Sequence, residues 1–155
     1  MPEVVRTLID KGDRELRQGD FDAAITSFSQ AIQTVPEDRR LVLATLHAMR
    51  ATCHLKNGAK DEALAEYDAA IRSGCTAGLA FHNRGRILAE KGNYQGAVAD
   101  FNRAIELDAS QAKTYHYRGL VYKKLGMRET ADQDFAKAKT LDPDVEKTSH
   151  LHLDE

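Results

Sequence analysis

The chain has 155 residues, 30% of them charged, and a formal net charge of −2. Its length predicts one domain with a substantial core, and the near-neutral charge gives no general attraction to nucleic acid or anionic membranes. There is no apolar run of membrane length, no secretory signal pattern and no disulfide framework with only two cysteines, so we expect a soluble, cytoplasmic protein.

Four pairs of helices are predicted along the chain, each pair joined by a turn at a glycine. These glycines recur after 39, 34 and 34 residues, where a left-handed backbone ends a helix: Gly19, Gly58, Gly92 and Gly126. The first helices are expected near residues 4–17, 39–56, 78–90 and 112–124, and the second near 22–34, 60–72, 95–107 and 128–140. Extra residues lengthen the first helix of the second pair, with Asp38 as its expected N-cap.

Small and aromatic residues recur at fixed places within each pair. The first helices carry a small residue that lets the second helix approach closely: Gly12, Ala51, Gly85 and Gly119. The second helices carry an aromatic residue between two alanines: Phe28, Tyr67, Phe101 and Phe135. In the first pair, Ala24, Phe28 and Ala31 are spaced i, i+4 and i+7, which places them on one helix face.

This pattern resembles the tetratricopeptide repeat family, whose unit is a helix–turn–helix of about 34 residues. The resemblance implies an all-α fold, a right-handed superhelical solenoid of four antiparallel helix–turn–helix units. The domain would span residues 1–145, with repeats near 5–38, 44–77, 78–111 and 112–145 and a polar C-terminal tail over 146–155. The second and fourth repeats depart from the pattern at the turn, where Ala59 and Met127 replace the polar residues Asp20 and Asn93.

Charged residues are predicted to close both ends of the stack. Asp132 and Lys139 in the last repeat, and Arg14 in the first, occupy places where the neighbouring repeats carry apolar residues. Burying an unpaired charge costs several kcal/mol, so these faces should be solvated, as the terminal repeats of a solenoid must be. We therefore expect a complete four-repeat array that is a monomer, with weak self-association as the alternative.

The sequence shows no pattern of a catalytic, metal or cofactor site. Cys53 falls in an apolar column, Cys75 falls near a helix end, and the glycines follow the repeat rather than a phosphate-binding loop. His150 and His152 form a His-x-His beside Asp154, although a flexible tail is the favoured interpretation there. We expect a protein that is not an enzyme and binds no cofactor or metal.

In this family the first helices line a concave groove that holds peptides or partner helices, which implies a binding role for their free positions. Basic residues predominate there in repeats two to four, beside amide, imidazole and phenol groups. Such a surface suits an extended acidic peptide or a terminal carboxylate, with the amide bonding the peptide backbone and the phenol stacking. The candidate groove residues are His82, Asn83, Arg86, Lys113, His116, Tyr117, Met49 and Thr52.

His82 and His116 occupy equivalent places in adjacent repeats, and two interpretations stay open. They are either polar groove residues, or a pair that gains protons below about pH 6.5 and so tightens an acidic ligand. Some relatives clamp the acidic tails of heat-shock chaperones with Lys, Asn and Arg residues. Only two of the five matching positions agree here, so such a receptor is disfavoured: Ala48, Thr52, Asn83, Lys113 and Tyr117.

The tail over 146–155 is too short for an additional capping helix. It is either disordered or docked in a groove, because its acidic end at Asp154 and Glu155 complements Arg86 and Lys113. The sequence therefore predicts a protein–protein interaction adaptor, with a self-assembling scaffold that uses groove and tail as the alternative. RNA binding is disfavoured by the net charge of −2 and by the absence of a series of stacking aromatic residues.

Overall fold

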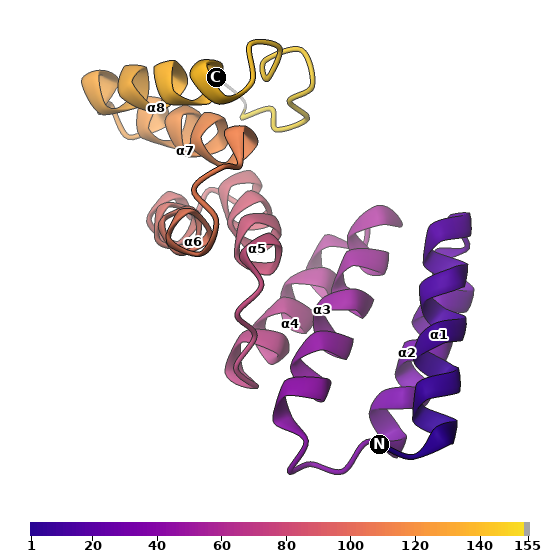
Figure 1. The fold of residues 1–155 in the computed structure, drawn as a ribbon. Helices are drawn as coiled ribbons and strands as arrows, with labels where there is room; N and C mark the ends of the chain where they lie inside the picture. The colour runs from indigo at the N-terminus through magenta and orange to yellow at the C-terminus, as the bar shows by residue number, and fades with distance from the viewer. Residues whose placement is uncertain (154–155) are drawn as a thin grey trace. The chain divides into compact units, whose positions relative to one another are not determined.

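The structure, a computed structural model, describes residues 1–153 and contains eight α-helices and no strand in that range (Figure 1). In chain order they are α1 (Glu3–Gln18), α2 (Phe21–Thr34), α3 (Arg40–Lys56), α4 (Lys60–Arg72), α5 (Gly78–Glu90), α6 (Tyr94–Leu107), α7 (Ala112–Lys124) and α8 (Arg128–Leu141). The all-α helical repeat fold is confirmed, and no helix end differs from its expected place by more than one residue. None of these helices within residues 1–153 is long and apolar enough to cross a membrane.

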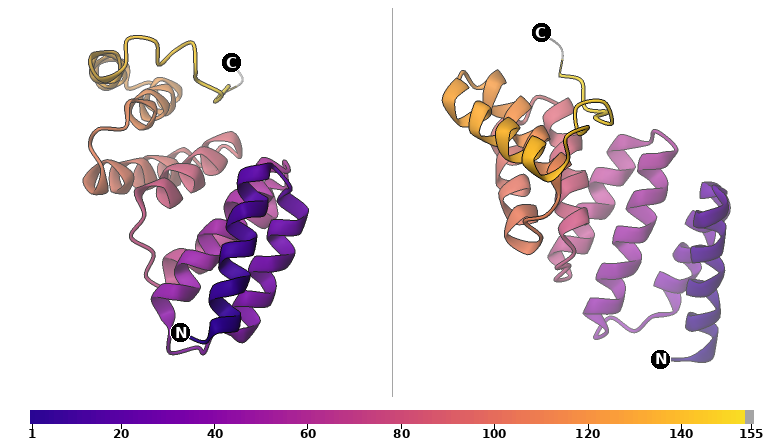
Figure 2. Two further views of the ribbon diagram at one scale, coloured as in Figure 1. Left: turned by 45° about the vertical axis from the view of Figure 1, so that its right-hand side comes forward. Right: turned by 45° about the horizontal axis from the view of Figure 1, so that its top comes forward.

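The helices form two compact units, with the boundary between Thr76 and Ala77. In unit 1, α1 packs against α2 and α3 against α4, and α2 also contacts α3. In unit 2, α5 packs against α6 and α7 against α8, while α7 contacts both α5 and α6. Figure 2 shows the paired helices of each hairpin side by side. Each unit therefore consists of two stacked hairpins.

The turns inside the hairpins follow the glycine pattern. Gly19 has φ 80° and ends α1, and the glycines of the other three turns are also left-handed, with φ from 77° to 79°. Side chains cap two of the following helices: Asp20 accepts a hydrogen bond from Ala23 and Asn93 accepts one from Gly96. The second and fourth turns have no such bond, because Ala59 and Met127 stand where the other two turns have Asp20 and Asn93.

The expected N-cap of α3 is wrong. The helix begins at Arg40 after Arg39, and no side chain caps it. The residues before it form a tight turn in which the Arg39 amide donates to the carbonyl of Pro36 at 3.0 Å. Asp38 therefore lies inside that turn, one residue too early to cap the helix.

Close contact between glycine and an aromatic ring fixes the spacing of the helices in three hairpins. A Cβ atom on Gly12 would lie 2.6 Å from Cε1 of Phe28, and one on Gly119 would lie 2.7 Å from Cε1 of Phe135. Real Cβ atoms do not come so near another carbon, because interiors are already close-packed. The second hairpin has Ala51 and Tyr67 at the matching places, 0% and 1% exposed. The predicted role of the small residues is thus confirmed.

The predicted stacking columns are confirmed within each unit. Ile25 and Ile32 of α2 pack on the core of unit 1, which includes Leu46 and Cys53 of α3. In unit 2, Val98 packs on a cluster that includes Tyr117 and Val121, and Ile105 packs on one that includes Tyr115 and Ala138. The charged residues expected at the two ends of the stack are exposed: Arg14, Asp132 and Lys139.

Three ion pairs recur at repeat spacing and were not predicted. Each joins an arginine of a first helix to a carboxylate of the second by two hydrogen bonds: Arg50 with Glu66, Arg84 with Asp100, and Arg118 with Asp134. Two of these arginines also donate a hydrogen bond to the preceding hairpin of their own unit. Arg50 donates to the Ser29 hydroxyl at 2.9 Å, and Arg118 donates to the side-chain oxygen of Asn102 at 2.7 Å. The bidentate pairs fix the geometry within each hairpin, and the bonds to Ser29 and Asn102 tie two of the hairpins to the preceding one.

Replacing Arg118 by methionine should lower the free energy of unfolding by about 2–3 kcal/mol, because it leaves the Asp134 carboxylate without its partner. The Asp134 side chain is only 8% exposed. In the matched control Arg103→Met, the lost pair with Glu106 is exposed on both sides, so the change should stay within about 0.5 kcal/mol. Urea denaturation followed by circular dichroism measures both, and equal losses would contradict a structural role for the buried pair.

Candidate functional site

The strongest candidate site lies on unit 2, where α5 and α7 meet. On α7, Lys113, Tyr117 and Leu120 are spaced i, i+4 and i+7 and share one helix face. On α5, Asn83 and Arg86 are spaced i, i+3 and share another. These five residues are called the α5–α7 face below. All of them except Leu120 are among the groove residues that the sequence predicted.

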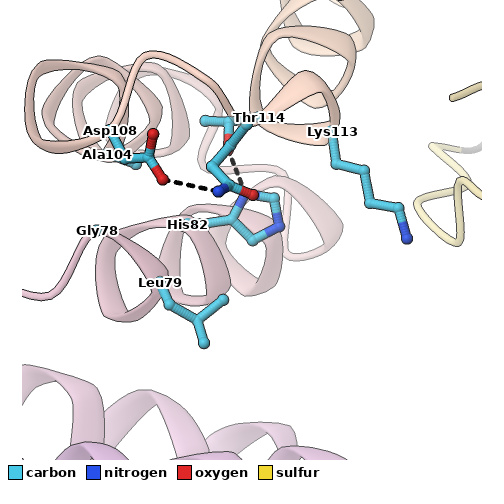
Figure 3. A pocket seen from close by; sticks show the side chains of 8 residues that line it. Gly78, Leu79, His82, Ala104, Asp108, Lys113 and Thr114 are labelled. Carbon is cyan, nitrogen blue, oxygen red and sulfur yellow. Dashed lines mark hydrogen bonds between the residues drawn. The ribbon is translucent and has the colours of Figure 1, made fainter. Parts of the chain in front are cut away.

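His82 of α5 lines a cavity of about 320 Å³ that α5 forms with α6 and the start of α7 (Figure 3). Its Nδ1 is 2.8 Å from Oγ1 of Thr114, and its ring stacks on Tyr117 with centroids 5.3 Å apart. Across the cavity, Gln111 donates a hydrogen bond to Asp108 at 2.7 Å. The histidine is therefore packed and hydrogen-bonded within unit 2 rather than projecting freely.

Two cations act on His82. Its pKa is lowered to about 4, chiefly because the ring is buried and further because of the positive charges of Arg86 and Lys113. One charge comes from α5 and the other from α7, so the two helices bring them together around the ring. Figure 3 shows Lys113 extending away from the other labelled side chains of the cavity. The hypothesis that His82 gains a proton below about pH 6.5 is wrong, because burial and these charges oppose it.

His116 belongs to the packing between α7 and α8. It is 7% exposed, and its ring contacts Phe135 of α8 and Tyr117, with centroids 5.5 Å and 6.1 Å apart. Burial lowers its pKa, although the charge of Glu146 acts in the opposite direction. The two histidines thus contact the same tyrosine, and burial lowers the pKa of both, which opposes the proposed protonation of the pair. Among the described residues, Nδ1 of His116 has no hydrogen-bond partner.

The other candidates on this face are covered to different degrees. Arg86 and Lys113 are half-buried, whereas Asn83 is 8% exposed and Tyr117 only 1%. The hydroxyl of Tyr117 accepts a hydrogen bond of 3.2 Å from the backbone amide of His150. The C-terminal segment therefore lies where a bound peptide was expected to stack.

Of the two alternatives for the tail, the structure has the docked one for the residues that it describes. Val145 and Leu151 are 1% and 3% exposed and belong to the apolar clusters of unit 2. No further helix follows α8 within residues 142–153, as expected from the length of the tail. Asp154 and Glu155, whose charges were expected to complement Arg86 and Lys113, lie outside the described residues.

Unit 1 offers a different surface. Met49 of α3 and Ile9 of α1 help to line an apolar cavity of about 290 Å³, together with Leu41, Val42, Thr45 and Leu46. Thr52, the other candidate in this unit, donates its hydroxyl to the carbonyl of Ala48 at 3.0 Å and lies 3.0 Å from the Tyr67 hydroxyl. The structure thus places Met49 at an open cavity and Thr52 in contacts within its own hairpin.

Comparison with known families agrees with this architecture. Residues 9–74 and 112–145 match profiles described as tetratricopeptide repeat, and residues 85–126 match one described as TPR repeat. The chain is a tetratricopeptide-repeat protein. A search of curated proteins finds no significant match.

Solved structures share the fold of this tetratricopeptide-repeat protein. MamA superposes with a TM-score of 0.78 at 20% identity, over 92% of this chain and 81% of MamA. A tetratricopeptide repeat protein from Parabacteroides merdae superposes with a TM-score of 0.78 at 23% identity. The match covers 96% of this chain but only 56% of the Parabacteroides chain. YrrB, described as a TPR protein with an unusual peptide-binding site, superposes with a TM-score of 0.72 at 23% identity. The match covers 86% of this chain and 66% of YrrB. At these identities the likeness concerns the fold alone.

The cysteines and histidines of this tetratricopeptide-repeat protein form no evident reactive centre. Cys53 is 0% exposed, and burial raises the pKa of its thiol to about 11, so it carries no nucleophilic thiolate at neutral pH. Cys75 is half-buried and also free. Within residues 1–153, no group of His, Cys, Asp and Glu side chains is arranged to hold a metal ion, and this includes His150 and His152.

The lowered pKa of His82 predicts a specific loss of stability in acid. His82 takes up a proton near pH 6.5 in the unfolded chain and only near pH 4 in the folded protein. The contribution of the neutral His82 ring to the free energy of unfolding is therefore complete above pH 6.5 and is lost as the pH falls toward 4. Between pH 7 and pH 4.5, wild type should lose about 2 kcal/mol more unfolding free energy than His82→Gln, which cannot titrate there. Urea denaturation at both pH values measures this, and identical losses would contradict the burial of a neutral ring.

Proposed function

We propose that this protein is a non-catalytic, cytoplasmic adaptor that binds an extended, acidic peptide or partner segment on the inner faces of its hairpins. The observation that carries the proposal is the convergence of Arg86 from α5 and Lys113 from α7 around His82. Because the His82 ring is neutral, the charges of Arg86 and Lys113 stay available to a ligand, and carboxylates form strong charge-assisted hydrogen bonds with such groups. The description of YrrB as a peptide-binding repeat protein supports the same use of the fold.

The α5–α7 face supplies more than charge to such a ligand. Leu120 lies one turn beyond Tyr117 on the same face of α7, so the cationic Lys113 is followed by two largely apolar side chains along the helix. Extended peptides are commonly held in this way, with pockets for some side chains and polar groups for the backbone. A dissociation constant of about micromolar is expected, because ordering an extended chain offsets much of the contact free energy.

A self-assembling scaffold is the second proposal, and exposed apolar residues on unit 1 favour it. Leu41, at the rim of the cavity near Met49, is 71% exposed, and Val4 on α1 is 60% exposed. Exposed apolar side chains beside a cavity are typical of surfaces that bind another protein. Light scattering over a range of concentrations separates this scaffold from a monomeric adaptor.

The double substitution Arg86→Glu/Lys113→Glu should weaken the binding of a fluorescently labelled decapeptide rich in Asp and Glu at least tenfold. The matched control is Lys137→Glu/Lys139→Glu, which changes the net charge equally at exposed positions of α8 and should change the affinity less than twofold. Fluorescence anisotropy at low and physiological salt measures both variants, because exposed charge pairs weaken with ionic strength. Equal losses in the two variants, or no binding by wild type, would reject the proposal.

A further inference from the structure

The segment after α8 contacts several positions of α7. Val145 lies in a cluster with Tyr115 near the start of α7, and the amide of His150 donates to the hydroxyl of Tyr117 in the middle of the helix. Leu153 lies near the end of the helix, where it lines a cavity of about 330 Å³ with Leu120, Lys123 and Lys124. The segment therefore runs parallel to α7 and covers successive positions of the α5–α7 face.

The last part of the segment contacts this face in the manner of an extended peptide. Leu151 is buried at 3% exposure and Leu153 is half-buried, whereas His150 before them and His152 between them are exposed. Alternate side chains thus point toward and away from the protein, as in an extended strand. Pockets for alternate side chains are also how other surfaces recognise extended peptides.

The contacts are few enough for the segment to leave. Among the described residues, two leucines and the bond from His150 to Tyr117 join residues 149–153 to the helices, while the Ser149 amide bonds only to Glu146 within the segment. Ordering the backbone of that many residues costs a free energy similar to the gain from burying two leucines. Tyr117 and Leu120 remain on α7 whether or not the segment is present, because α7 is held by α5, α6 and α8. Release of the segment would therefore expose a preformed apolar surface.

We propose that the face of α7 that carries Tyr117 and Leu120 is a binding site for an extended segment with two aliphatic residues two positions apart, and that residues 149–153 occupy it in the absence of a partner. The inference rests on the proposed adaptor function and deepens it, since the tail itself specifies the ligand chemistry. Lys123 and Lys124 beside Leu153 favour an acidic residue directly after the second aliphatic one. The partner is thus an aliphatic–x–aliphatic–acidic segment that displaces the tail.

The test uses the full-length variant Leu151→Ser/Leu153→Ser and a labelled synthetic peptide with the sequence of residues 146–155. Anisotropy titrations should show that the variant binds this peptide at least tenfold more tightly than wild type does, because its own tail no longer competes. A peptide with both leucines changed to serine should bind neither protein. Equal affinity of wild type and variant, or no binding to the variant, would overturn the proposal.

Two controls keep the result interpretable. Leu141→Ser removes a leucine of α8 that is 37% exposed, and it should leave the affinity of wild type for the peptide unchanged within twofold. Adding Leu120→Asp to the double variant should abolish binding, since Leu120 lines the cavity that receives Leu153. If the double variant loses helical content by circular dichroism, Leu153→Ser alone replaces it, with an increase of at least threefold expected and no increase counting against the proposal.

Failure of this inference is distinguishable from failure of the adaptor proposal. The acidic decapeptide is titrated against the same wild-type and double-variant proteins. If it binds both equally, and binding depends on Arg86 and Lys113, the adaptor function stands and the tail is only a structural cap. If only the tail-derived peptide binds, and only to the variant, the occupied site stands and the general preference for acidic peptides is rejected.

Discussion

In every hairpin, a residue with little or no side chain on the first helix lies where the second helix places an aromatic ring. With glycine at positions 12, 85 and 119, even one additional carbon would meet the ring at 3.0 Å or less. This contact sets the spacing of the two helices. Because the small residue must face the ring, it also sets the rotation of each helix about its axis. That rotation decides which residues of α5 and α7 turn away from their hairpin partners and become available to a ligand.

The two units use this shared geometry for different surfaces. In unit 2, a series of rings runs from Phe101 through His82 and Tyr117 to His116 and Phe135, with neighbouring centroids 5.3 to 6.1 Å apart along it. Burial beside these rings lowers the pKa of both histidines, and the hydroxyl of Tyr117 accepts a hydrogen bond from the C-terminal segment. In unit 1, the corresponding region is aliphatic and opens to the cavity near Met49. A cationic surface and an apolar one are therefore built from equivalent repeat positions.

The sequence predicted the helices closely because the repeat itself carries the information. Period, turn glycines and small-to-aromatic pairing are local signals, so α6 was expected at 95–107 and is observed at Tyr94–Leu107. The side-chain environment was less predictable, because it depends on contacts between helices. The repeat position of His82 predicts that it lies on a first helix, but it does not predict the contacts of its ring with Thr114 and Tyr117.

Two features that were missed or left open illustrate this difference. The arginine–carboxylate pairs do have a sequence signal, because arginine recurs at positions 50, 84 and 118 with a carboxylate 16 residues after each. The docking of the tail has only a weak sequence signal, which is the alternation of Leu151 and Leu153 with histidines. Such a short pattern fits a disordered segment equally well, so only the structure distinguishes the two.

The contact between small residue and ring is tested most directly by a double-mutant cycle with Gly119→Ala and Phe135→Val, measured as free energies of unfolding in urea. In the native background, the added methyl group meets the Phe135 ring, and a loss of about 1–3 kcal/mol is predicted. In the Phe135→Val background, the same change should be neutral or stabilising by up to about 1 kcal/mol, because alanine favours helix over glycine. An equal effect of Gly119→Ala in both backgrounds would contradict the account.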